Sequence, residues 1–594
     1  MRKTLLTGVA VCALLASFTG AGPRAPRPAD DDKRLAALFD AYWERNNRLF
    51  PLSATSQGDN RYNDQLPNDQ TRAYRDTLRA FYQGYLNKLQ SFKRAQLSDN
   101  DKISYDIFQY KLQTELNGWK QNAWLTPFKQ FWGLPISFVQ YGSGEGAQPF
   151  KTVQDYDNWL VRARQFPVWA DSAIGNFRRG MQAGVVLPKA LVVKMIPQAR
   201  ALVVTDPAKS TFYGPINKLP ASFSAADKQR LTTAYQQLIL RDVVPTYQKL
   251  ADFLEKEYLP KARTTTGLAD VPGGPELYKF YVKNWTTTEK TPEEIYQTGL
   301  AEVKRIRTEM ERVKAQVGFQ GDLPAFFQFM KTDKQFMPYK TPEEVLTAYR
   351  AIQARITPNL PKYFSRQPKS PFEIRQTEAF RAASASAEYN RAAADGSRPG
   401  IFYVPILDAA TFTTPGMESL FLHEAIPGHH FHISLQQENT ALPKFRRFGG
   451  YSASSEGWAL YTESLGKDLG LYTDPYQYMG ALSNEIHRAI RLVVDVGMNT
   501  KGMTREQAIK YMMDNEAINE QKATAEIERY MAIPGQALSY KIGQLKIQEL
   551  RDKYKKQLGP KFSLRAFHDE FLKDGIMPLA VLERKMDAWA AAQK

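Results

Sequence analysis

Apolar side chains recur every three or four residues through most of the chain, a spacing typical of amphipathic helices. The segments that carry this pattern most clearly are residues 32–50, 69–92, 99–117, 231–259, 291–317 and 341–356. The last two begin alike, because Thr291 and Thr341 each precede a Pro-Glu-Glu run that supplies a cap, a first-turn proline and acids at the helix start. The pattern predicts a mainly α-helical protein.

Turn-forming residues interrupt these helical segments at residues 141–149, 264–275 and 365–371. The second interruption contains a Pro-Gly-Gly-Pro run, which favours a boundary at this point. We therefore predict an N-terminal helical lobe of residues 23–265 and a C-terminal lobe of residues 266–594. The two lobes are expected to form one continuous unit.

One short region is expected to be extended. Residues 372–378 and 401–406 carry β-branched and aromatic side chains, and a loop with glycine and proline separates them. They come just before a cluster of histidines at residues 423–432. The pattern predicts a small β element beside the helix that carries this cluster.

The N-terminus is typical of a secretory signal peptide. Arg2 and Lys3 precede an apolar run over residues 5–18, so residues 1–22 are predicted to be cleaved, with an uncleaved anchor as the alternative. No other apolar stretch approaches the roughly 20 residues of a membrane span, and we expect no stable membrane insertion after cleavage. The single cysteine, Cys12, lies in this segment, which excludes thiolate chemistry from the mature chain. We expect a periplasmic or secreted protein.

The rest of the composition is that of a soluble globular protein, with 43% hydrophobic and 24% charged residues among 594. The net charge of +17 is compatible with binding to nucleic acid or to an anionic surface. The basic residues are spread along helical segments, however, and no nucleic-acid-binding motif occurs. Neither a phosphate-binding loop nor a G-x-S-x-G serine motif is present. We therefore expect a solvated basic surface and no nucleic-acid partner.

The segment HEAIPGHHFH, residues 423–432, contains four of the six histidines of the chain. A glutamate beside a histidine is the arrangement of zinc hydrolases, in which H-E-x-x-H puts two ligands on one helix face and the glutamate acts as general base. Pro427 occupies the position of the second histidine, so the helix must kink or bulge there. Spacing leaves both His429 and His430 open as the second ligand, and the glycine before His429 favours His429.

A zinc site of this kind needs a third protein ligand. In SSEGWALYTESLG, Glu456 and Glu463 share a helical stripe with apolar residues, and a carboxylate there is costly to bury unless it is paired or binds metal. Glu456 is the candidate ligand, Glu424 the candidate base, and Glu463 a carboxylate that supports a ligand. A helix-start acid stabilised by the helix dipole is the alternative for Glu456.

Two later segments are less diagnostic. Arg488, Arg491 and Asp495 share a helix face, and a structural ion pair between Arg491 and Asp495 is expected. Around a Pro-Gly break, the chain places Arg529, Tyr530, Tyr540 and Lys541. A tyrosine hydroxyl there can stabilise an oxyanion, and an arginine or lysine can hold a substrate carboxylate. Core packing is the alternative for either tyrosine.

The chain resembles the bacterial family known as domain of unknown function 885. The segments HEAIPGHH, SEGWALYTE, RLVVDVG and YMAIPGQALSY carry the resemblance most specifically, and it spans nearly the whole mature chain. That family looks like a distant relative of gluzincin metallopeptidases, whose thimet-type members have a glycine directly before the second histidine. Two positions depart from the pattern, His432 where relatives usually have glutamine and Asn499 where they often have histidine.

The resemblance implies a helical body with a central channel and a Zn²⁺ ion held by His423, His429 and Glu456. The expected function is an exported zinc-dependent peptidase that hydrolyses oligopeptides, with Glu424 as general base and Tyr530 or Tyr540 assisting the oxyanion. One alternative is a metal-dependent hydrolase of small amides or esters. A second alternative is a helical binding protein whose metal site is structural or vestigial.

Overall fold

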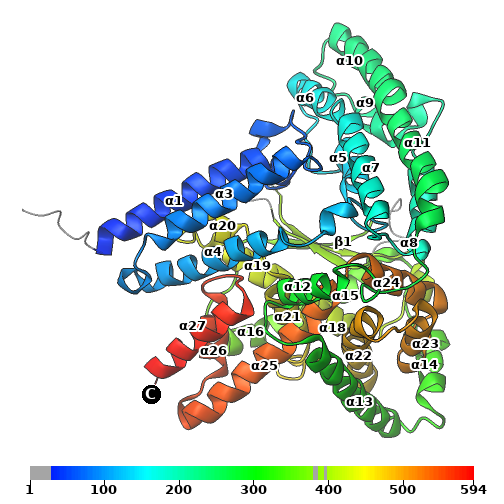
Figure 1. The fold of residues 1–594 in the computed structure, drawn as a ribbon. Helices are drawn as coiled ribbons and strands as arrows, with labels where there is room; N and C mark the ends of the chain where they lie inside the picture. Colours follow the sequence, from blue (N-terminus) through cyan, green and yellow to red (C-terminus); the bar gives the residue numbers. More distant parts are fainter. Residues whose placement is uncertain (1–27, 379–385, 393–397, 594) are drawn as a thin grey trace, which may run out of the picture.

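The computed structural model describes residues 28–378, 386–392 and 398–593, so the predicted signal peptide lies outside the described residues. The fold is mainly α-helical with one small three-stranded sheet, as the hydrophobic pattern predicts. Figure 1 shows three groups of helices that spread from a common centre. Among the described residues, no helix combines the length and the apolar character needed to cross a membrane.

The first group contains the long helices near the N-terminus, which lie side by side in Figure 1. They are α1 (Pro28–Leu49), α3 (Arg72–Gln90) and α4 (Asp99–Gly118), with the short α2 (Pro51–Ser56) between them. These helices share a hydrophobic cluster with the C-terminal part of the chain. Phe39 and Phe108 place their ring centroids 4.8 and 5.1 Å from that of Phe445 on α20 (Lys444–Arg447).

The second group has an aromatic core of its own, in which the rings of Phe138 and Phe166 stack with centroids 4.3 Å apart. Its helices are α5 (Leu134–Gly142), α6 (Val153–Ala163), α7 (Phe166–Gln182), α8 (Lys189–Arg200), α9 (Gly214–Asn217), α10 (Ala225–Leu238) and α11 (Val244–Phe253). The predicted lobe boundary near residue 265 stays a prediction. The hydrophobic clusters separate this second group from the first group, which packs with the C-terminal helices.

Residues 231–259, expected as one helix, are divided by π-helical turns at Ile239–Val243 and Leu254–Tyr258. Pro245 and Pro260 follow these turns closely. A proline has no N–H to donate and its ring crowds the carbonyl one turn earlier, so the backbone before it widens. The predicted caps at Thr291 and Thr341 are present, and Thr291 forms a reciprocal capping box with Glu294.

The third group forms the centre of the molecule and its C-terminal part. Its longer helices are α12 (Gly274–Thr286), α13 (Pro292–Gln316), α14 (Leu323–Thr332), α15 (Pro342–Ile356), α18 (Met417–Glu424), α19 (His429–Glu438), α21 (Ser452–Glu463), α22 (Pro475–Thr500), α23 (Arg505–Asn515), α24 (Glu520–Ala532), α25 (Ser539–Leu558), α26 (Leu564–Leu572) and α27 (Leu579–Ala592). The short α16 (Leu360–Tyr363) precedes the sheet. Helices α21 and α25 pack closely because Gly457 faces Gly543, and a Cβ on Gly457 would lie 2.5 Å from backbone atoms of Gly543.

The sheet contains β1 (Phe372–Gln376), β2 (Glu388–Asn390) and β3 (Gly400–Val404). The central strand β3 pairs in parallel with β1 and antiparallel with β2. The two predicted strands are β1 and β3, whereas the three residues of β2 are too few to produce a recognisable pattern. The ring of Phe372 lies 4.5 Å from that of His430 on α19, and Phe402 contacts Phe421 on α18. The sheet therefore lies beside the helices that carry the histidine cluster.

Candidate metal centre

The HEAIPGHH segment is two helices joined by a tight connection. Helix α18 ends at Glu424, and α19 begins at His429 after a cis bond between Ile426 and Pro427. A Cβ on Gly428 would lie only 2.0 Å from the carbonyl oxygen of His423, so only glycine allows the chain to pass there. The Trp458 indole N–H donates to the Pro427 carbonyl at 2.8 Å and ties the connection to α21. This connection brings His429 back beside His423.

His423, His429 and Glu456 converge, and one ligand atom from each lies within 4.8 Å of the others. Glu456 Oε2 is 3.2 Å from His429 Nε2 and 3.6 Å from His423 Nε2. The two imidazole rings are perpendicular, with centroids 4.9 Å apart. The three residues come from α18, α19 and α21, so the site exists only where these helices meet.

The spacing of these atoms fits a tetrahedral zinc ion. Zinc–nitrogen bonds of about 2.0–2.1 Å at tetrahedral angles separate two ligand atoms by about 3.3–3.4 Å. The distances from Glu456 to the two histidines, 3.2 and 3.6 Å, lie on either side of this value. Two imidazoles and one carboxylate are also the donor set of zinc hydrolases. The residues present therefore fit the ion that the sequence predicts.

A chain of hydrogen bonds orients His423 from behind. Its Nδ1–H donates to Glu463 Oε1 at 2.7 Å, and the other oxygen of Glu463 accepts from Ser419 Oγ at 2.6 Å. Asn484 Nδ2 on α22 donates to Ser419 Oγ at 3.0 Å. The carboxylate fixes the ring so that Nε2 of His423 faces Glu456 and His429, and such support is usual for metal-binding histidines. Ser419 and Asn484 have no motif around them, so no sequence signal points to either residue.

His429 and His430, the two candidates for the second ligand, have different surroundings. His429 takes part in the convergent group, whereas His430 Nδ1 lies 3.0 Å from the Tyr389 hydroxyl on β2. Burial lowers the pKa of His430 to about 4, so this ring is neutral at pH 7. His432 is buried with no hydrogen-bond partner for either ring nitrogen in the described part of the chain, and it packs against both Trp458 and Phe571. The tertiary structure therefore brings His429, and not His430, to the candidate centre.

The surroundings shift the pKa values of the two carboxylates at the centre, Glu424 and Glu456, in opposite directions. Burial raises the pKa of Glu424, against the attraction of His423 and His429. Burial also acts to raise the pKa of Glu456, but the two histidines outweigh it and hold that pKa below its usual range. Glu456 and Glu463 raise the pKa of His423 to about 9 despite its burial. A carboxyl with raised pKa beside an ionised ligand is the distribution that acid–base chemistry needs.

The two candidate tyrosines differ in their surroundings. The Tyr530 hydroxyl donates to Glu526 at 2.5 Å and accepts from Arg491 Nε at 2.9 Å, so its proton is already engaged. Tyr540 lies with its ring 4.6 Å from the Arg491 guanidinium carbon. Burial raises the pKa of Tyr540 and the negative charge of Glu456 raises it further, which places Tyr540 in the neighbourhood of the metal-ligand group.

The expected ion pair between Arg491 and Asp495 is wrong. Asp495 accepts hydrogen bonds from the Tyr278 hydroxyl at 2.7 Å and from the Gly535 backbone N–H at 3.0 Å, and Arg491 instead pairs with Glu526 at 3.2 Å. A spacing of four residues puts two side chains within reach, but their neighbours on other helices decide where each one points. Burial raises the pKa of Asp495 to about 7 because no cation pairs with it among the described residues.

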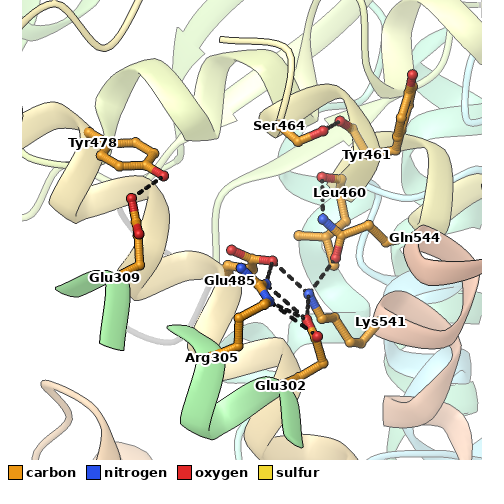
Figure 2. Close-up of polar contacts among 10 residues, drawn as sticks. All are labelled: Glu302, Arg305, Glu309, Leu460, Tyr461, Ser464, Tyr478, Glu485, Lys541 and Gln544. Atoms are coloured by element: carbon orange, nitrogen blue, oxygen red, sulfur yellow. Dashed lines mark hydrogen bonds and ion pairs between the residues drawn. The ribbon is translucent and has the colours of Figure 1, made fainter. Parts of the chain in front are cut away.

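The other two candidate cations are fully engaged. Lys541 is completely buried and donates to Glu302, Glu485 and Gln544 at 2.9, 2.6 and 2.8 Å. Figure 2 shows this lysine between the three acceptors. Arg529 donates to Glu526 and to Gln536. Both cations are therefore taken up by contacts within the protein, and neither is a candidate to hold a substrate carboxylate.

Two cavities lie outside the metal-ligand group. One of about 930 Å³ lies between α3 and α7, and one of about 210 Å³ is lined by α4, α12 and the segment before α21. The central channel implied by the resemblance stays a prediction.

Two solved structures share this fold. One, described as "the putative lipoprotein from Colwellia psychrerythraea", is 29% identical, has a TM-score of 0.86, and the match covers 95% of this chain and 99% of that one. The other, described as "a putative lipoprotein of unknown function from Shewanella oneidensis", is 20% identical with a TM-score of 0.73, and its match covers 93% and 99%. No curated protein matches. Residues 51–586 match the family of bacterial proteins of unknown function called DUF885, and the chain belongs to that family.

Proposed function

We propose that this protein is an exported zinc-dependent peptidase that acts on oligopeptides. The observation that carries the proposal is the convergence of His423, His429 and Glu456, with Glu424 buried one residue from the first ligand. A site with a purely structural ion has no use for a buried carboxyl with a raised pKa at that position. The resemblance to gluzincins supports the same assignment.

The proposed chemistry divides between the ion and the protein. Zinc, when bound, lowers the pKa of a water molecule to about 7 and polarises a carbonyl. Glu424 takes the proton of the attacking water and returns it to the leaving amine. Glu463 holds His423 in the tautomer whose Nε2 carries the lone pair. Tyr540 is the better placed of the two tyrosines to donate a hydrogen bond to the oxyanion, because the Tyr530 proton already serves Glu526.

The proposal includes export from the cytoplasm. The first 22 residues have the pattern of a signal peptide, and the two solved structures are each described as a "putative lipoprotein". A location outside the cytoplasm agrees with a chain whose single cysteine lies within that pattern.

Elemental analysis and kinetics of the purified mature protein test the proposal. We expect about one zinc per chain, lost in His423→Ala and Glu456→Ala, and cleavage of unmodified oligopeptides. Glu424→Gln is expected to keep the metal and to lose at least about a hundredfold in kcat, the usual contribution of a general base. Glu506→Gln, an exposed glutamate on α23, is the matched control and should retain full activity.

Three outcomes would contradict the proposal. A protein that binds no zinc when the metal is supplied would remove the centre itself. Cleavage of small amides or esters without cleavage of peptides would favour the non-peptidase hydrolase. Zinc binding without turnover of any substrate in the panel would favour a binding protein with a structural ion.

A further inference from the structure

Arg491 is a buried arginine whose hydrogen bonding is incomplete. It lies in the middle of α22 and is 7% exposed. Its Nε donates to the Tyr530 hydroxyl at 2.9 Å, and its Nη2 donates to His487 at 3.1 Å and to Glu526 at 3.2 Å. Its Nη1 is buried and has no hydrogen-bond partner among the described residues. A guanidinium has five N–H donors, and leaving one unmatched in the interior is costly.

Arg488, one helical turn earlier on the same face, repeats the feature. Its Nη1 donates to the Asn484 carbonyl at 3.0 Å, but its Nε is buried without a partner in the described part of the chain. No described carboxylate lies within 4 Å of its guanidinium nitrogens. Two neighbouring arginines therefore each retain an unused, buried N–H group.

Both arginines lie on α22, which packs against α18, the helix that carries His423. Arg488 lies one turn after Asn484 on α22 and donates to its carbonyl at 3.0 Å, and the Asn484 side chain reaches Ser419 at 3.0 Å, one turn before His423 on α18. The guanidinium of Arg491 packs on the ring of Tyr540, with its carbon 4.6 Å from the ring centroid. The same helix α22 supplies Asn484, the end of the hydrogen-bond chain behind His423.

The charged side chains around Arg491 carry more positive than negative charge. Arg491 and Arg529 share a single carboxylate, that of Glu526, at 3.2 and 2.9 Å. Glu516, the other nearby acid, accepts from His487 at 2.7 Å. Arg488 adds a further positive charge with no acid paired to it among the described residues. An anionic group that approached these two arginines would balance the charge and match both unused donors.

We propose that Arg488 and Arg491 form a subsite that holds a carboxylate of the substrate beside the metal centre. This inference rests on the proposed function and specifies its substrate class, namely peptides that present a carboxylate close to the scissile bond. The carboxylate comes from the C-terminus or from an acidic side chain, and both offer the same paired oxygens to the two guanidinium groups. Such a subsite fixes the position of the peptide and makes the enzyme selective for anionic chain ends or residues.

Three versions of one N-acetylated peptide test the subsite in the zinc-loaded mature protein. The first has a free C-terminus, the second a C-terminal amide, and the third a C-terminal amide with glutamate as the last residue. We expect kcat/KM for the free acid, for the glutamate peptide or for both to exceed that of the neutral amide by about tenfold to a hundredfold, the usual effect of hydrogen bonds to a charged group. The preferred version identifies the source of the carboxylate.

Substitution of the arginines should remove this preference. Arg488→Gln is the primary variant because it leaves no described carboxylate unpaired. Arg491→Lys is the second variant, since it keeps a positive charge beside Glu526 but loses the planar array of guanidinium N–H donors. In both, KM for the favoured peptide should rise about tenfold or more while the neutral amide changes little. Arg312→Gln, an exposed arginine on α13, is the matched control and should leave the ratio unchanged.

Direct binding separates this inference from the proposed function. Calorimetry with the Glu424→Gln protein measures the dissociation constants of the three peptides without turnover. If no peptide is cleaved but the carboxylate versions still bind at least tenfold more tightly, and Arg488→Gln removes that difference, the function fails and the subsite stands. If peptides are cleaved with equal kcat/KM whatever their charge, the subsite is refuted and the proposed peptidase stands.

Discussion

Two buried charge clusters lie along α22, and they differ in how completely their donors are matched. In the Lys541 cluster, formed by Glu302, Arg305, Glu485, Lys541 and Gln544, the three N–H groups of the ammonium meet three acceptors (Figure 2). In the Arg491 cluster, formed with Arg488, His487, Glu526 and Tyr530, two arginine N–H sites lack partners among the described residues. A closed cluster contributes to folding, whereas an open cluster retains capacity for a ligand.

The titration of buried acids shows the same contrast. Burial acts to raise the pKa of Glu485, but the charges of Lys541 and Arg305 outweigh it and lower that pKa. Asp495, on the same helix, receives hydrogen bonds but forms no ion pair with any described cation, and burial raises its pKa to about 7. Hydrogen bonds alone therefore do not offset the desolvation of a carboxylate here, and a cation does.

Loss of the central cation should cause the largest change. Lys541→Met leaves Glu302 and Glu485 with Arg305 alone, so we expect the free energy of unfolding to fall by about 3–5 kcal/mol, as measured by denaturant titration. Lys510→Met, which breaks an exposed pair with Asp514, is the matched control and should cost no more than about 1 kcal/mol. Equal losses in the two variants would mean that the Lys541 cluster does not hold the fold together.

Asp495 should make the free energy of unfolding depend on pH, by up to about 4 kcal/mol. The folded protein keeps the Asp495 proton up to about pH 7, whereas the unfolded chain releases it near pH 4, so this group lowers stability progressively from pH 4 to pH 7. Asp495→Asn removes that loss. The stability of the variant relative to wild type should therefore rise across this window and stay constant above it, and a difference independent of pH would contradict the assignment.

The carboxylate behind His423 should affect the ion more than the fold. Glu463→Gln weakens the support of the His423 ring, and we expect metal affinity to fall about 10–100-fold in competition with a chelator. Glu549→Gln, a more exposed glutamate on α25, serves as the control and should leave metal affinity unchanged. Unchanged affinity in Glu463→Gln would show that the hydrogen-bond chain from α22 does not support the centre.

Removal of Arg305, the more exposed cation of the Lys541 cluster, should change the free energy of unfolding least. The side chain of Arg305 is 50% exposed, and Lys541 still contacts both carboxylates when Arg305 is removed. Arg305→Gln should therefore lower the free energy of unfolding by about 1 kcal/mol. A loss as large as that of Lys541→Met would show that the two cations act as one unit.

Local patterns anticipated much of this molecule because their causes are local. The capping box at Thr291 and the break at Pro427 follow from hydrogen bonding and sterics within one turn of the chain. The bounds of the helices expected at residues 99–117, 291–317 and 341–356 agree within one residue for the same reason. The expected pair of Arg491 with Asp495 failed because the partners of both residues lie on other helices, at Glu526 and Tyr278.

The amino-acid sequence by itself determined the helical class, the small β element and the set of residues able to bind a metal. It left His429 and His430 as rivals, since both are close to His423 along the chain. Only the tertiary structure decided between them, because the passage of Gly428 past the His423 carbonyl turns His429 toward Glu456 and leaves His430 against the sheet. Residue types and periodicity are encoded locally, whereas the meeting of atoms from α18, α19, α21 and α22 depends on how the helices pack.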